Sequence, residues 1–390
     1  MGLKSRLAKA KNSLGRSLCL MALLLTLTGC AIPRVSAEDR LFLPVSVEFL
    51  DEYRIPQTTA VEGTPVRGLS ALTYDRERDR LYLLSDDRSE QAPARFYTAK
   101  LQISPEPIAI ASLEMEAVTF LKDEGGNTFA PGSLDPEGLA LSPRNTLFIA
   151  SEGVSRAGIP PFVDEFDLSG QRIGRIPIPQ RYLPPAEGTD PPQGVQDNRG
   201  FESLTIVTER SGAGNREPFR MFAAIEEPLV QDVLEPEDSD TPAKGRLLHY
   251  LVGEAQTLLI SEHLYPIAPL PFGAFNNGLV ELLPLDPGHF FSLERSFGLG
   301  GSGIKLFQIA TGGATDTSNI ERFSASVNTI QPIRKRLVLD LAELGIELDN
   351  IEGMAHGLRL PDGSRSLLLI SDDNFNDGQF TQLLLFRLNL

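Results

Sequence analysis

A segment that recurs along the chain constrains the fold more than any other feature of the sequence. Each copy contains a short apolar strand that begins near a glycine or an acidic residue, then a turn, then a second apolar strand that ends in acidic residues. One copy runs from Asp135-Pro-Glu-Gly-Leu to Ser-Glu152, and another from Asn350-Ile-Glu-Gly-Met to Ser-Asp-Asp373. Short strands that alternate with turns indicate an all-β fold. The remaining copies begin at Arg67, Arg199 and Asn277.

The spacing of the copies predicts a β-propeller. The acidic markers Glu137, Glu202, Glu281 and Glu352 are 65, 79 and 71 residues apart, which leaves room for about four strands in each unit. A roughly regular period with four strands per unit is typical of propeller blades. We expect five blades, with a sixth as the alternative if residues 310–334 hold strands rather than a loop.

The two ends of the propeller segment are expected to meet in the last blade. This unit offers only three strands of its own, the third over residues 382–390, so its fourth strand would be residues 43–53. Such a pairing would close the ring and remove exposed sheet edges. The best helical candidate is short and covers residues 337–344.

Residues 1–29 have the form of a secretion signal. Five basic residues and no acidic residue precede or flank an apolar run at residues 18–27, which is too short to span a bilayer. The ending Leu27-Thr-Gly-Cys30 resembles the lipobox of bacterial lipoproteins. This resemblance implies cleavage before Cys30, acylation of Cys30 and a place in the cell envelope, in the periplasm, at the outer membrane or at the cell surface. An ordinary cleaved signal with an incidental cysteine is the alternative.

We therefore expect three segments: a lipoprotein signal at residues 1–29, a lipidated tether at residues 30–42 and a propeller domain at residues 43–390. The two cysteines are Cys19 and Cys30, so the mature chain would hold no disulfide. The formal net charge of −16 would become −21 without the five basic residues of the signal.

So acidic a chain repels nucleic acid and anionic membrane surfaces. We expect no nucleic-acid partner, and membrane contact only through the lipid on Cys30. The charge suits the binding of metal cations, although a generally acidic, solvated surface is the commoner cause. The sequence leaves the oligomeric state open.

The repeated acidic residues are expected to gather at one mouth of the propeller. The two strands of each copy are antiparallel, so the start of the first strand and the end of the second lie at the same end of a blade. Some of these residues would instead cap turns or pair with neighbouring blades. The acidic residues placed at this mouth are Asp86, Asp87, Glu137, Glu152, Glu202, Glu226, Glu227, Glu281, Glu294, Glu352, Asp372 and Asp373.

Carboxylates held so close together need positive partners. Two like charges about 4 Å apart cost roughly 4 kcal/mol at an effective dielectric constant of about 20, and raised pKa values, arginines or a bound metal would relieve this repulsion. Calcium suits several oxygen ligands in a flexible geometry. Arg88, Arg295 and His356 are predicted to bind an anionic substrate at this mouth. The predicted Ca²⁺ ligands are Asp86, Glu137, Glu202, Glu352, Asp372 and Asp373.

Several of the recurring segments resemble a family of bacterial exported proteins, the "esterase-like activity of phytase" family. The motifs are Asp135-Pro-Glu-Gly-Leu, Arg199-Gly-Phe-Glu-Ser-Leu and Asn350-Ile-Glu-Gly-Met, the last followed by Ser371-Asp-Asp-Asn. The resemblance extends over nearly the whole chain after the signal. It implies a propeller and hydrolysis of phosphate or other esters.

The sequence lacks the common signatures of other hydrolases. It has no Gly-x-Ser-x-Gly nucleophile elbow, no His-Glu-x-x-His zinc motif and no phosphate-binding glycine-rich loop. The main hypothesis is therefore a metal-assisted hydrolase of a small anionic or ester substrate. The alternatives are a non-catalytic propeller that captures a ligand or a protein at the same mouth, and a lactonase-like hydrolase of sugar acids.

Overall fold

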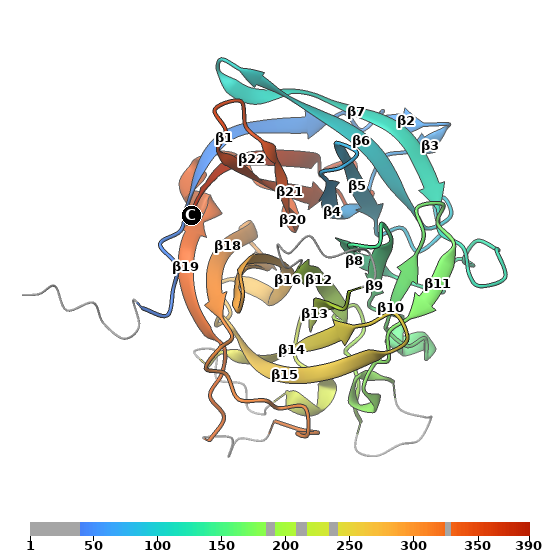
Figure 1. Ribbon diagram of the computed structural model, residues 1–390, viewed down its shortest axis with the longest axis vertical. Coiled ribbons are helices and arrows are strands. Elements are labelled where there is room, and N and C mark those ends of the chain that lie inside the picture. Colours follow the sequence, from blue (N-terminus) through green and yellow to red (C-terminus); the bar gives the residue numbers. More distant parts are fainter. Residues whose placement is uncertain (1–39, 185–191, 208–216, 234–240, 324–328) are drawn as a thin grey trace, which may run out of the picture. The chain divides into compact units, whose positions relative to one another are not determined.

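Five antiparallel sheets of four strands each surround a common axis in the described part of the chain (Figure 1). The computed structural model describes residues 40–184, 192–207, 217–233, 241–323 and 329–390. The propeller is formed within Leu43–Leu390. The described residues contain strands and four short 3-10 helices but no α-helix. The predicted all-β propeller, with five blades, is confirmed.

Each blade is built outward from an inner strand. The first blade holds β4 (Leu69–Asp75), β5 (Arg80–Ser85), β6 (Arg95–Pro105) and β7 (Ile108–Phe120). The second holds β8 (Pro136–Leu141), β9 (Leu147–Ser151), β10 (Phe162–Phe166) and β11 (Arg172–Arg175). The third holds β12 (Phe201–Val207), β13 (Phe219–Ile225), β14 (Ala243–Val252) and β15 (Thr257–Ile267).

The fourth and fifth blades follow the same plan. The fourth holds β16 (Ala274–Asp286), β17 (His289–Gly298), β18 (Gly301–Ala310) and β19 (Arg334–Asp340). The fifth holds β20 (Asn350–Arg359), β21 (Arg365–Asp372), β22 (Thr381–Asn389) and β1 (Ser46–Ile55). Outside the blades lie the small hairpin β2 (Ala60–Val61) and β3 (Thr64–Pro65), and the 3-10 helices η1 (Ser155–Ala157), η2 (Gln180–Tyr182), η3 (Val230–Asp232) and η4 (Leu341–Leu344).

Strand β1 closes the ring as the outermost strand of the last blade. It pairs antiparallel with β22, from Ser46 opposite Asn389 to Ile55 opposite Thr381, and the two strands lie side by side in Figure 1. The pairing of the two ends of the propeller segment is therefore confirmed. Because β22 is covered in this way, its hydrogen-bonding edge is not left open to another chain.

Two expectations about the fourth blade differ from the structure. The described part of residues 310–334 holds no sixth blade, because the residues described between β18 and β19 form turns and bends rather than paired strands. Residues 337–344 are not an α-helix: β19 continues to Asp340 and only η4 is helical. The Asp340 carboxylate accepts a hydrogen bond from the Ala342 N–H and so caps this single turn. Pairing with β18 outweighs the weak helical tendency of such a short segment.

The core lies between the blades, where sheets stack face to face. The inner strands contact one another around the axis, β4 with β8 and β20, and β12 with β8 and β16. The strands behind them are buried on both faces: every residue of β9 is buried, and so are five of the six residues of β5. Strands covered on both faces are continuous apolar runs rather than alternating ones, which explains sequences such as Leu81-Tyr-Leu-Leu in β5 and Leu147-Phe-Ile-Ala in β9.

A β-bulge in every inner strand sets the geometry of one end of the propeller. The pairing with the next strand skips one residue in each blade, at Ser70, Glu137, Glu202, Val280 and Glu352. A bulged residue is left out of the ladder and its side chain is re-aimed. We call these five residues the bulge ring.

The residue after each inner-strand bulge packs against a neighbouring strand. A Cβ at Gly138 would lie 2.5 Å from the Glu202 carbonyl oxygen, and one at Gly353 would lie 2.8 Å from the Ser70 carbonyl oxygen. Glycine therefore permits the close approach of adjacent inner strands at these two bulges.

The predicted signal at residues 1–29 and the predicted lipid site Cys30 lie outside the described residues. Among the described residues, no helical segment has the length and hydrophobicity that a transmembrane span requires.

Candidate functional site

An acidic cavity of about 730 Å³ lies where the inner strands begin. We call it the acidic mouth. Its carboxylates come from Asp86 and Asp87 after β5, Asp135 and Glu137 at the start of β8, Glu202 in β12, Glu352 in β20 and Asp372 in β21, with Glu90 at its edge; its guanidinium groups belong to Arg88, Arg156, Arg199 and Arg295.

A second ring of side chains completes the acidic mouth. In each blade, the inner-strand residue just before the bulge pairs with a residue near the end of the second strand. The ring takes the residue that follows this partner in the sequence. Four members are acidic and one is basic. They are Asp86, Glu152, Glu226, Arg295 and Asp372. We call these five residues the strand-end ring. Six members of the two rings, drawn from all five blades, line the acidic mouth: Asp86, Glu137, Glu202, Arg295, Glu352 and Asp372.

The structure brings most of the predicted site residues together. Asp86, Glu137, Glu202, Glu352 and Asp372 all line the acidic mouth. Arg88 and Arg295, predicted to bind substrate, line it too. The convergence follows from the blade geometry: equivalent hairpins arranged in a circle place the same strand ends at the same opening.

The fourth blade departs from the sequence-based alignment by one residue. Its bulge falls at Val280 rather than at Glu281, and the strand-end position is Arg295 rather than Glu294. Glu281 is buried, and its side chain accepts a hydrogen bond from its neighbour, the Leu282 N–H, at 2.8 Å. Burial raises the pKa of Glu281 well above its ordinary value, although N–H groups of Leu204 and Met354 on the flanking inner strands oppose this. Glu281 therefore links three inner strands instead of lining the mouth.

Aligning the glycines would have revealed this shift. Arg67-Gly-Leu-Ser, Arg199-Gly-Phe-Glu and Asn277-Gly-Leu-Val share a glycine two residues before the bulge. That alignment places Val280 opposite Glu202 and identifies Arg295 as the one basic residue of the strand-end ring.

Asp373 and Glu294 are held by structural partners. The Asp373 carboxylate accepts hydrogen bonds from Arg67 Nε at 2.7 Å and from the Gly68 N–H at 3.0 Å, so it fixes the start of β4 and does not line the acidic mouth. Glu294 accepts hydrogen bonds from the Tyr265 hydroxyl at 2.7 Å and from Lys335 Nζ.

Asp87 also serves structure, although it borders the cavity. It pairs with Arg95, whose Nη1 lies 2.7 Å away, and it accepts three backbone N–H hydrogen bonds. Burial works to raise the pKa of Asp87, but the Arg95 ion pair and these N–H donors hold it below its ordinary value.

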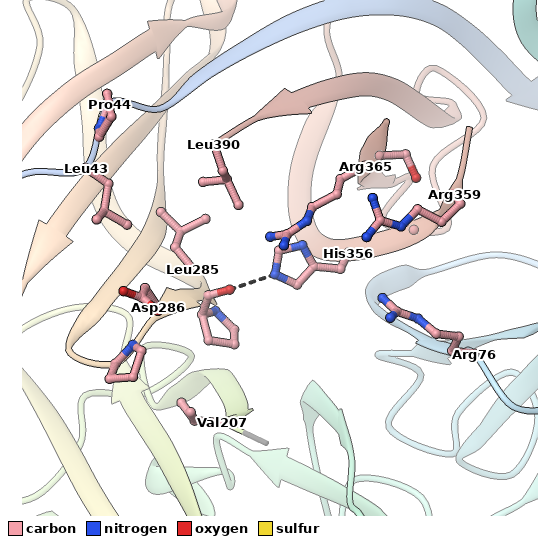
Figure 2. A pocket seen from close by; sticks show the side chains of 14 residues that line it. Leu43, Pro44, Arg76, Val207, Leu285, Asp286, His356, Arg359, Arg365 and Leu390 are labelled. Carbon is pink, nitrogen blue, oxygen red and sulfur yellow. Dashed lines mark hydrogen bonds between the residues drawn. The ribbon is translucent and has the colours of Figure 1, made fainter. Parts of the chain in front are cut away.

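His356 does not reach the acidic mouth. It lies four residues after Glu352 in β20, and four residues of a strand span about 13 Å, whereas the same spacing in a helix is a single turn. Its Nε2 donates a hydrogen bond to the Pro284 carbonyl oxygen at 2.6 Å, at the opposite end of the inner strands (Figure 2). The predicted placement of His356 is therefore wrong, because β structure separates the two residues.

The arginines of the acidic mouth already neutralise part of its charge. Arg88 forms a two-point ion pair with Asp135, with Nε 2.7 Å from Oδ1. Arg295 Nη2 lies 2.9 Å from a Glu352 carboxylate oxygen and 3.4 Å from one of Glu226. Burial disfavours the Arg295 cation, but the carboxylates of Glu352, Glu226 and Glu202 raise its pKa. Arg199 contacts Glu226 and Glu227 at 3.2 and 3.1 Å.

The remaining carboxylates hold their protons more tightly than usual. Burial, followed by the charges of neighbouring carboxylates, raises the pKa of Asp86, Glu137, Glu152, Glu202 and Asp372 well above the ordinary value. Burial also raises the pKa of Asp135 and of Glu352, although Arg88 and Arg295 oppose it. A cluster with this electrostatic strain favours a bound cation.

Two overlapping groups of carboxylates have the spacing of metal ligands. Oxygens of Asp135, Glu137 and Glu152 lie within 4.8 Å of one another, and so do oxygens of Glu152, Glu202 and Glu226. Glu152 belongs to both groups. These sets contain only carboxylate oxygens, which hard cations such as Ca²⁺ prefer.

Two buried oxygens give independent support for a cation. Among the described residues, Asp86 Oδ1 and Glu202 Oε2 are buried and have no hydrogen-bond partner. A buried carboxylate oxygen without a donor is costly, and a metal ligand bond would satisfy it. The residues present therefore fit a divalent cation, with Asp135, Glu152 and Glu226 as candidate ligands that the sequence-based set omitted.

Comparison with known protein families agrees with this arrangement. The family model described as "Phytase-like: Esterase-like activity of phytase" matches residues 64–375. The chain belongs to the phytase-like family. The matched segment contains every residue of the bulge ring and of the strand-end ring of this phytase-like propeller. The family description names a hydrolytic activity, and no curated protein matches the sequence.

Several solved structures resemble the phytase-like propeller only distantly. An endo-arabinase from Bacteroides thetaiotaomicron has 12% identity and a TM-score of 0.44, over 87% of this chain and 98% of that chain. The catalytic domain of the Coprinopsis cinerea GH62 α-L-arabinofuranosidase has 8% identity and a TM-score of 0.40, over 88% and 97%. A glycosyl hydrolase from Bacteroides ovatus has 13% identity and a TM-score of 0.39, over 82% and 84%. These similarities carry no argument about the site.

Proposed function

We propose that the phytase-like propeller hydrolyses phosphate or other esters at the acidic mouth with the help of a divalent cation, most simply Ca²⁺. The observation that carries this proposal is the pair of carboxylate groups that share Glu152, together with the unpartnered oxygens of Asp86 and Glu202. When bound, the cation would polarise an ester oxygen and lower the pKa of the attacking water.

The residues of the chain would divide the work between binding and proton transfer. Asp135, Glu137, Glu152, Glu202 and Glu226 would hold the cation. Asp86 would join these ligands through its unpartnered Oδ1. Asp372 lines the same cavity outside the two ligand groups, and its raised pKa suits exchange of a proton with water or with the leaving oxygen.

Arg295 is the better placed of the two predicted substrate-binding arginines. Its Nε is buried without a hydrogen-bond partner among the described residues, whereas Arg88 is committed to Asp135 by two hydrogen bonds. A guanidinium group binds anionic oxygens with directed hydrogen bonds. Arg295 would therefore orient the substrate, and Arg88 would hold Asp135 in place.

The test uses a chain that begins after Cys30, because all five closed blades lie within Leu43–Leu390. Bound metal would be measured by elemental analysis, and hydrolysis of phytate, p-nitrophenyl phosphate and p-nitrophenyl acetate would be followed with Ca²⁺ and with chelator. We expect calcium-dependent turnover of at least one ester, and its loss in Glu202→Gln. Glu114→Gln, on the exposed side of outer strand β7, is the matched control. A calcium-loaded protein that turns over none of these esters would refute the proposal.

A second candidate function is capture of a ligand or a protein without turnover. Exposed apolar side chains beside the acidic mouth favour it: Phe275 and Phe297 lie with ring centroids 6.3 Å apart, Phe297 borders the cavity, and Leu299 is exposed nearby in sequence. For this function, calcium would raise the melting temperature while no ester is consumed.

We also propose that the chain is exported and anchored through a lipid on Cys30, on the strength of the signal-like residues 1–29. Labelling of growing cells with a tagged fatty acid should mark the wild-type protein and not Cys30→Ser. Equal labelling of both proteins would exclude acylation at this cysteine.

A further inference from the structure

A second cavity, of about 920 Å³, lies at the other ends of the inner strands. Arg76 follows β4, Arg359 ends β20 and Arg365 begins β21, and all three line this cavity together with His356. We call it the basic mouth. Figure 2 shows the three guanidinium groups turned toward one another around the His356 ring. The two cavities share no lining residue.

Arginines outnumber acidic side chains among the described residues that line the basic mouth. Asp286 is the only acidic side chain among the described residues that line the cavity, and Figure 2 places it across from the guanidinium groups. Two nearby carboxylates already pair with other arginines. Asp75 contacts Arg78 at 2.6 Å, and Asp362 contacts Arg387 at 3.0 Å.

His356 adds shape to this site rather than charge. Burial lowers the pKa of His356; the hydrogen bond to Pro284 opposes this shift, and the nearby cations Arg365 and Arg76 add to it, so the ring is neutral at neutral pH. The Nε2–H then donates to the Pro284 carbonyl oxygen, which ties β20 to the end of β16. The ring thus forms a fixed floor between the arginines.

We propose that the basic mouth binds a phosphate-bearing anion, at a site separate from the acidic mouth. Guanidinium groups match phosphate oxygens with paired, charge-assisted hydrogen bonds, and three that converge on one cavity suit a group with more than one negative charge. Arg359 is already oriented by a hydrogen bond from its Nη1 to the Gly363 carbonyl oxygen at 3.1 Å. Val207, Leu285 and Leu390 supply apolar wall for the organic part of the ligand.

The same chemistry is found in a soluble phosphate monoester and in the headgroup of an anionic phospholipid. The concave shape of the basic mouth accepts either one. The experiment therefore has two arms, which use the same variants and identify the source.

In the first arm, inorganic phosphate and glycerol 2-phosphate are titrated calorimetrically into the chain that begins after Cys30, with chelator present so that no metal brings phosphate to the acidic mouth. In the second arm, sedimentation is measured with phosphatidylcholine vesicles, with and without phosphatidic acid. We expect saturable binding in at least one arm. Arg76→Gln combined with Arg359→Gln should weaken it at least about tenfold, since the variant loses charge-assisted hydrogen bonds to the phosphate oxygens.

Two controls separate this site from the proposed catalytic one. Arg54→Gln removes an arginine of outer strand β1 that pairs with Glu52 and with Glu347. Glu137→Gln alters only the acidic mouth. Both variants should bind like wild type. Melting temperatures would establish that every variant is folded. Binding in neither arm, equal binding by the double variant, or loss of binding in Glu137→Gln would overturn the proposal.

Discussion

The two mouths of the propeller are built on the two ends of the same inner strands, yet they carry opposite charge. The acidic mouth takes equivalent positions from all five blades, the bulge ring and the strand-end ring. The basic mouth takes its arginines from the turns of two neighbouring blades, after β4 and between β20 and β21. A site made from repeated positions is symmetrical and visible in the sequence, whereas a site made from single turns is local and is not.

Metal removal should produce the largest difference between the mouths. Chelation is expected to reduce ester hydrolysis by about 100-fold or more, because the cation contributes several kcal/mol to the transition state. Added Ca²⁺ should restore the rate. The double variant Arg76→Gln with Arg359→Gln should respond to chelator as wild type does; a hydrolytic rate that falls with these arginines instead would place the chemistry at the basic mouth.

Glycine substitutions should show that the acidic end is the more tightly packed. Gly138→Ala would drive a Cβ against the Glu202 carbonyl oxygen and should lower the free energy of unfolding by about 1–3 kcal/mol. At the other end, a Cβ at Gly357 would meet side-chain atoms of Ser366 and Leu368, which have more freedom to move, so Gly357→Ala should cost less. Gly312→Ala, with open space around it, is the control. If urea denaturation shows a larger loss of unfolding free energy for Gly357→Ala than for Gly138→Ala, this account is contradicted.

The pH dependence of stability should come from the acidic mouth. The pKa values of Glu137, Glu152 and Glu202 are raised in the folded protein, so the stability that they contribute is present below the ordinary carboxyl range and is lost as pH rises through the folded values. Without metal, the melting temperature should fall by several degrees between pH 5 and pH 8. Calcium should remove most of this fall, and Glu202→Gln should reduce it. Burial works to raise the pKa of Asp75, but Arg78 holds it below the ordinary value. Asp75 therefore affects the pH dependence of stability only at more acidic pH.

The smallest effect is expected from the single acidic side chain of the basic mouth. Asp286→Asn removes an exposed negative charge from the cavity wall and should tighten phosphate binding by about twofold, since exposed charges contribute little. Calorimetric titration would measure it. Weaker binding in this variant would mean that Asp286 orients an arginine rather than repelling the ligand.

The sequence predicted the fold and the acidic mouth well because both depend on repetition. The spacing of the acidic markers indicated the blades, and residues 43–53 were predicted to form the missing outer strand of the last blade. Errors arose where one blade departed from the repeat, and where two residues four positions apart in an extended strand were assumed to lie at the same end of it. The bulge at Val280 rather than Glu281 depends on pairing with β17, and His356 lies at the other end from Glu352 because β20 is extended.

The structural roles of some acidic residues could not be seen from the sequence. Asp373 is bound by Arg67, more than three hundred positions earlier in the chain, and Glu294 is bound by Lys335 in the outer strand of its own blade. Such partners are set by packing. Conversely, Asp135 was visible in the motif Asp-Pro-Glu-Gly, but its place beside Glu137 and Glu152 required the three-dimensional arrangement.

The bulge in each inner strand also makes substitutions at one position differ in their consequences from substitutions in the rest of the strand. In a regular strand, replacing a residue on one face disturbs the alternation on which the core depends, but a bulged residue stands outside that alternation. Ser70 and Val280 are the two members of the bulge ring without a carboxylate. Val280 packs in the hydrophobic core, so Ser70 is the position where new chemistry could be introduced, by evolution or by a protein engineer, while the register of all five sheets stays as it is.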